Sequence, residues 1–158
     1  MNSKSYSLFL KDFKSELRTR YAINALAMFI IVAISVIIFS VGNEKISTSL
    51  TGGLFWVVIF FTAMSGLSRA FVSEEERGTS LTLQLIAAPS TVFLGKLLFN
   101  IILVFAMNTI IAVLYSAIFE AFIIQNFVLF LVSFVLGNIG LAVSSTIIAA
   151  IIAKAGAK

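Results

Sequence analysis

Residues 97–119 read LLFNIILVFAMNTIIAVLYSAIF, a stretch of 23 residues without a charged side chain. A helix that crosses a hydrocarbon core of about 30 Å needs about 20 predominantly apolar residues, so this stretch is long enough to span a membrane. Three other uncharged runs lie at 21–43, 46–68 and 121–153. The sequence therefore predicts an all-α integral membrane protein with about four transmembrane helices, at about 22–41, 50–68, 97–119 and 127–153.

The composition excludes most enzyme chemistry. Hydrophobic residues make up 60% of the 158 residues and charged residues 11%, whereas soluble domains carry about 25% charged residues. The chain has no cysteine and no histidine, which removes thiolate and imidazole metal sites, cysteine nucleophiles and histidine acid–base catalysis. We therefore expect no enzymatic activity, no catalytic residue and no metal site in this chain.

The basic residues predict the orientation of the spans. Of the 11 lysines and arginines, ten lie before the first run, between the second and third, or after the fourth, and one, Lys45, lies between the first and second. The positive-inside rule then places both termini and the loop at 69–96 in the cytoplasm. The net charge of +4 thus reflects topology, and we expect no nucleic-acid partner.

The segment at 78–95 is also uncharged, but half of its 18 residues are glycine, proline or polar. It is too polar for an unassisted span, although a re-entrant or interfacial segment stays an alternative. A fifth span here would also reverse the orientation of every later segment across the membrane, and the asymmetry of the basic residues would be lost.

The first 20 residues predict an amphipathic helix on the inner membrane surface. Apolar side chains recur at helical spacing, and basic side chains gather on another face. The apolar face includes Phe9, Phe13 and Leu17, and the basic face includes Lys11, Lys14 and Arg18. Such a helix would favour anionic lipid head groups. The alternative is a solvated positive flank without a further role.

Polar residues inside the predicted spans are few, and no charge lies at mid-bilayer. This pattern argues against proton- or sodium-coupled transport, which needs ionisable groups in the membrane. Asn108 stands near the middle of the third run. It either lines a substrate path or, as we expect, makes a hydrogen bond between helices.

The loop at 69–96 carries three consecutive glutamates, Glu74–Glu76, followed by Gly78, Thr79 and a leucine-rich stretch. An acidic apex is the opposite of what a membrane-surface anchor would carry. The loop therefore suits docking to a cytoplasmic protein, and a solvated connector is the alternative.

The loop resembles the one between the second and third spans of ABC-2-type permeases. Together with KDFKSELRTRYAINALAMF (Lys11–Phe29) and GGLFWVVIFFTAMSGLSRAF (Gly52–Phe71), it resembles the haem exporter protein B family (CcmB) of the cytochrome c maturation system. The residues that this resemblance implies for ATPase docking are Ser73, Glu74, Glu75, Glu76, Arg77, Gly78 and Thr79. The structural residues of the loop motif are Leu81, Pro89, Gly95 and Lys96.

The resemblance implies a permease subunit of ABC-2 fold, in which residues 1–20 form the interfacial helix and a cytoplasmic helix at about 73–79 couples to a separate ATPase. It further implies that ATP is bound in that partner, that this chain binds no cofactor directly, and that haem is the handled ligand. The implied partners are other cytochrome c maturation subunits in the bacterial inner membrane, in a homodimer or hetero-oligomer. The chain has no GxxxxGK[ST] phosphate loop, in agreement with that division of labour.

Two other functions fit the same residues: an ABC-2 permease for a drug, lipid or glycan, and a membrane assembly scaffold without transport. Members of the family usually have about six spans. We therefore expect an ABC-2 fold that is C-terminally short, because the sequence predicts about four.

Overall fold

The computed structural model describes residues 3–42, 44–76 and 88–156. Within these ranges the chain is helical, without strands. The helices are α1 (Ser3–Thr19), α2 (Tyr21–Val41), α3 (Thr48–Glu76), α5 (Pro89–Ile118) and α6 (Phe127–Gly156). Four of them, α2, α3, α5 and α6, are long and apolar enough to cross a membrane. The predicted all-α integral membrane fold is confirmed.

Two helices continue into the predicted cytoplasmic loop. Helix α3 extends to Glu76, and α5 begins at Pro89. Proline is favoured in the first turn of a helix because its missing N–H group has no partner there in any case. The part of the loop at 77–87 lies outside the described residues.

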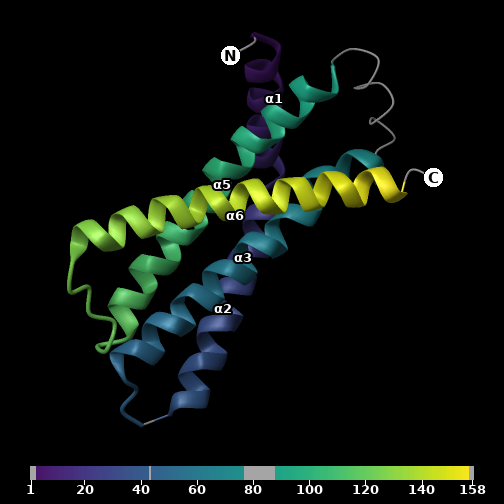
Figure 1. Ribbon diagram of the computed structural model, residues 1–158. Helices are drawn as coiled ribbons and strands as arrows, with labels where there is room; N and C mark the ends of the chain where they lie inside the picture. The colour runs from purple at the N-terminus through teal and green to yellow at the C-terminus, as the bar shows by residue number, and fades with distance from the viewer. Residues whose placement is uncertain (1–2, 43, 77–87, 157–158) are drawn as a thin grey trace.

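The four long helices alternate in direction, so that their connections lie at two ends (Figure 1). The α2–α3 and α5–α6 connections lie together at one end, at the lower left of the figure. The end of α3, the start of α5 and helix α1 lie towards the other end. We call this second end the α1 end.

Short polar side chains cap the N-termini of two of the spans. Ser47 Oγ accepts a hydrogen bond from the N–H of Leu50, and Asn126 Oδ1 accepts one from the N–H of Leu129. Each bond satisfies an amide that has no partner within its own helix. Gly42 caps the end of α2, and its φ of 56° is one that other residues adopt at a steric cost.

One apolar core joins all five helices. In α2 every fourth residue from Ala22 to Ile34 is buried, as expected for one face of a helix. This face belongs to the same cluster as Ile59 of α3 and Ile111 of α5, both fully buried. The faces that remain exposed are also apolar, as they are in a helix bundle surrounded by lipid.

Two hydrogen-bonded rungs connect α5 to α6. Asn108 Nδ2 donates to Asn138 Oδ1 over 2.7 Å, and Asn100 Nδ2 donates to Thr146 Oγ1 over 2.7 Å. Asn100 and Asn108 are eight residues apart, as are Asn138 and Thr146, so the rungs fit one antiparallel register. All four side chains are buried. We call these four residues the amide ladder.

The ladder decides between the two roles open for Asn108. Its amide group makes a bond between helices, and Asn138 also donates to the carbonyl oxygen of Phe134 on its own helix. The expected interhelical hydrogen bond is therefore confirmed.

We expect the rung between Asn108 and Asn138 to contribute about 0.6 kcal/mol of coupling, and at most about 1.7 kcal/mol, to the free energy of unfolding. The test is a double-mutant cycle with Asn108→Leu and Asn138→Leu, measured by denaturation in mixed detergent micelles. A matched cycle that pairs Thr109→Val with Asn138→Leu should give no coupling, because Thr109 is exposed and bonds only to Phe105 of its own helix. Equal coupling in both cycles would contradict the prediction.

Candidate functional site

The acidic run ends a long helix. Ser73, Glu74, Glu75 and Glu76 form the last turn of α3, and their side chains lie outside the described part of the structure. The carboxyl end of a helix carries partial negative charge, so three glutamates there oppose the helix dipole by roughly 0.3–1 kcal/mol each. No basic residue occupies this turn. Helix stability therefore does not explain the glutamates, which favours a role in binding.

The remaining docking residues that the resemblance implies, Arg77, Gly78 and Thr79, lie outside the described residues, as does Leu81 of the loop motif. Their assignment stays a prediction. The other three residues of the motif, Pro89, Gly95 and Lys96, lie among the first eight residues of α5.

Helices α5 and α1 approach each other closely at Gly95. A Cβ atom added at Gly95 would lie 3.0 Å from Leu8 Cβ and 3.1 Å from the carbonyl oxygen of Ser5. Contacts that short are tighter than ordinary van der Waals distances. The glycine of the loop motif thus lets α1 lie directly against the helix that follows the loop (Figure 1).

Lys96, the next residue, is buried, with 3% of its surface exposed. A lysine is almost never fully buried unless its ammonium group has a partner, and Lys96 is among the residues that make an interaction within the structure. The loop motif identified in the sequence ends with Gly95 and Lys96. The structure places both residues in α5, with Gly95 against α1.

Helix α1 packs two of the three residues of its predicted apolar face against the core and exposes the third. Phe9 and Phe13 pack against the core, and their rings stack with centroids 5.8 Å apart. Leu17 is 53% exposed. The three basic residues, Lys11, Lys14 and Arg18, are exposed.

A carboxylate holds the turn between α1 and α2. Glu16 Oε1 accepts a hydrogen bond of 2.9 Å from the N–H of Ile23, in the first turn of α2. The residue between the helices, Arg20, has a φ of 51°, the left-handed region, which costs a non-glycine residue roughly 1 kcal/mol or more. Glu16 therefore acts as the helix cap that Arg20 cannot provide.

The structure thus brings the apolar face of α1 together with Gly95, and sequence reasoning missed the residues that make this contact. Ser5 and Leu8 belong to no motif of the sequence, so no signal in it pointed to them. Among the described residues, no group of three or more aspartates or glutamates is placed to hold a metal ion.

The CcmB protein family model matches residues 3–156. Comparison with curated proteins and with solved structures gives no match. The family match spans every described helix, including the acidic end of α3 and the contact between α1 and α5. This multi-pass membrane protein therefore belongs to the CcmB protein family.

Proposed function

We propose that this chain is the permease subunit of an ABC-type haem exporter in cytochrome c maturation. In this role it couples ATP hydrolysis by a separate cytoplasmic ATPase to the handling of haem at the bacterial inner membrane. The observation that carries the proposal is the family match over residues 3–156. The four apolar helices support the membrane part of this role.

The docking step is assigned to the acidic end of α3, at Glu74–Glu76, together with residues 77–79. The charges of three adjacent glutamates oppose the helix dipole, and they would bind best to a basic surface on the partner. This assignment requires the α1 end to face the cytoplasm, with both termini inside, as the distribution of lysine and arginine predicts.

Movement at the docked end would pass into the membrane through α5. This helix starts next to the loop, contacts α1 at Gly95 and is joined to α6 by the amide ladder. A rigid helix with specific contacts at both of its neighbours is the kind of element that transmits a rigid-body displacement. The contact network supports this route, and coupling measurements would establish it.

Haem, in this proposal, is cargo whose iron is ligated by another subunit. The chain has no histidine and no cysteine, which are among the residues that commonly hold haem iron. Other cytochrome c maturation subunits in the membrane are the proposed partners, in a homodimer or hetero-oligomer. The chain then contributes the helices and the mechanical link to ATP hydrolysis.

We expect a strain that lacks this chain to lose its c-type cytochromes, and the wild-type chain to restore them. In proteoliposomes, the chain should also stimulate ATP turnover by its ATPase. Unchanged cytochrome content would favour a permease for another substrate, such as a drug, lipid or glycan. Restored cytochromes without any stimulation of ATP turnover would favour an assembly scaffold instead.

A further inference from the structure

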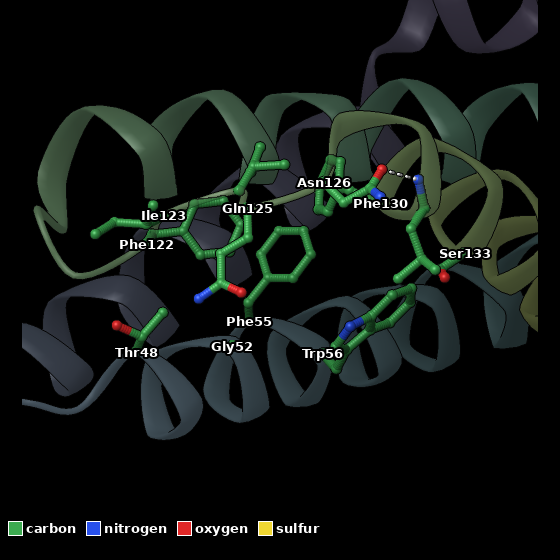
Figure 2. Close-up of a pocket in the computed structure, with 12 residues that line it drawn as sticks. Thr48, Gly52, Phe55, Trp56, Phe122, Ile123, Gln125, Asn126, Phe130 and Ser133 are labelled. Carbon is green, nitrogen blue, oxygen red and sulfur yellow. Dashed lines mark hydrogen bonds between the residues drawn. The ribbon is translucent and has the colours of Figure 1, made fainter.

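A pocket of about 350 Å³ lies between the start of α3, the α5–α6 connector and the start of α6. It is at the end of the spans opposite to the α1 end, and no residue that the sequence analysis assigned to a site lines it. This volume is at the lower end of the range for small-molecule sites. Figure 2 shows the pocket with its side chains projecting from all three segments.

Aromatic rings form much of the wall. Phe55, Trp56, Phe122 and Phe130 all line the pocket, and the ring of Phe55 lies 4.8 Å from that of Phe122 and 6.0 Å from that of Phe130. Flat aromatic surfaces favour a flat partner, which they bind by stacking or by edge contacts.

The indole of Trp56 is held in place by Gly137. A Cβ atom at Gly137 would come within 2.9 Å of two ring carbons of Trp56, so the ring rests directly on the backbone of α6. A ring fixed in this way presents a prepared surface and loses little freedom when a ligand binds.

The polar groups of the pocket are all neutral. They are the hydroxyls of Thr48 and Ser133, the side-chain amides of Gln125 and Asn126, and the indole N–H of Trp56. In Figure 2, Gln125 extends from the connector towards α3, between Thr48 and Phe55. None of the described residues that line the pocket is ionisable. Such a site offers donors to carbonyl oxygens but no counter-charge to a carboxylate or phosphate.

From this lining we propose that the pocket binds the uncharged, flat ring of a membrane-soluble molecule, with carbonyl substituents on the ring and a hydrocarbon chain: the chemistry of a quinone. Three exposed aliphatic side chains also line the pocket, Ile123, Ile124 and Leu129, and these would meet the chain. The inference does not depend on the proposed function. It concerns the opposite end of the spans and a different class of molecule.

Two adjacent glycines provide a matched pair of variants. A Cβ atom at Gly52 or at Gly53 would meet nothing within 4 Å, so the first atom of a side chain fits at either position. Only Gly52 lines the pocket. Gly52→Phe therefore fills the pocket, whereas Gly53→Phe makes the same change one residue away.

The experiment follows the fluorescence of Trp56, the only tryptophan in the chain, while the full chain in nanodiscs is titrated with decylubiquinone, which quenches indole emission. We expect saturable quenching for the wild type and for Gly53→Phe, and at least tenfold weaker binding for Gly52→Phe. Gln125→Leu, at an exposed position, should weaken binding several-fold. Circular dichroism checks that each variant keeps its helix content.

Three results would overturn the proposal. The first is linear quenching of equal slope in all the proteins, which reports only partition of the quinone into the membrane. The second is displacement of the quinone by decanol at equal concentration, which assigns the pocket to the hydrocarbon chain alone. The third is tighter binding of haem, with its two carboxylates, than of the quinone.

Discussion

Replacing Glu74, Glu75 and Glu76 together by lysine is expected to abolish association with the cytoplasmic ATPase, while the chain still inserts into the membrane. The reversal changes the local charge by six units at a surface proposed to meet a basic partner. Like charges across an interface cost several kcal/mol, which corresponds to a loss of more than 100-fold in affinity. Co-purification of the tagged ATPase with the membrane chain measures the effect.

The position of these residues makes the result easy to interpret. They form the last turn of α3, where lysines interact favourably with the helix dipole and glutamates do not. The substitution should therefore strengthen the end of the helix, so lost binding cannot be explained by unfolding. The control is Glu120→Lys, an exposed reversal at the other end of the spans, which should leave ATPase capture intact. Capture of the ATPase by the triple variant at the wild-type level would refute the docking assignment.

Gly95→Leu is expected to separate α1 from α5 and to lower the free energy of unfolding by roughly 1–3 kcal/mol, the usual cost of overpacking a close contact. The first added atom would already lie 3.0 Å from Leu8 Cβ and 3.1 Å from the backbone oxygen of Ser5. The backbone oxygen cannot turn aside as a flexible side chain can. Helix α1 must therefore move.

Gly140→Leu is the matched control, because a Cβ atom at Gly140 meets nothing within 4 Å. Both changes put leucine in place of glycine inside a helix, and they differ in the space around it. Denaturation in mixed micelles should show a large loss of stability for Gly95→Leu and none for Gly140→Leu. Equal losses would show that the approach of α1 to α5 does not depend on Gly95.

The sequence predicts the spans well because an uncharged run of sufficient length has few alternatives to a membrane helix. The helical spacing in α1 is also a local signal, and it agrees with the packing of Phe9 and Phe13 but not with the exposure of Leu17. The lengths of α3 and α5 were less predictable: both helices continue past the apolar run into polar residues, at Glu76 and Pro89, where hydropathy gives no signal.

Contacts between segments far apart in the chain were beyond the reach of sequence patterns. Gly95 was identified by its motif, but its role depends on Ser5 and Leu8, ninety or so residues earlier. The cap from Glu16 to Ile23 depends on a turn with positive φ at Arg20, which no residue preference indicates. The aromatic pocket combines three separate segments, none of which has a motif of its own.

The amide ladder limits how the membrane helices can move past one another. A slip of α6 along α5 by one turn would set Asn108 against Ala142 or Phe134, and neither side chain offers a hydrogen-bonding group. Both rungs would break at once, because they share one register, and each buried amide left without a partner costs about 1–3 kcal/mol. Helices α5 and α6 should therefore tilt together as one rigid unit. A passage through the membrane would then open between other helices of the bundle.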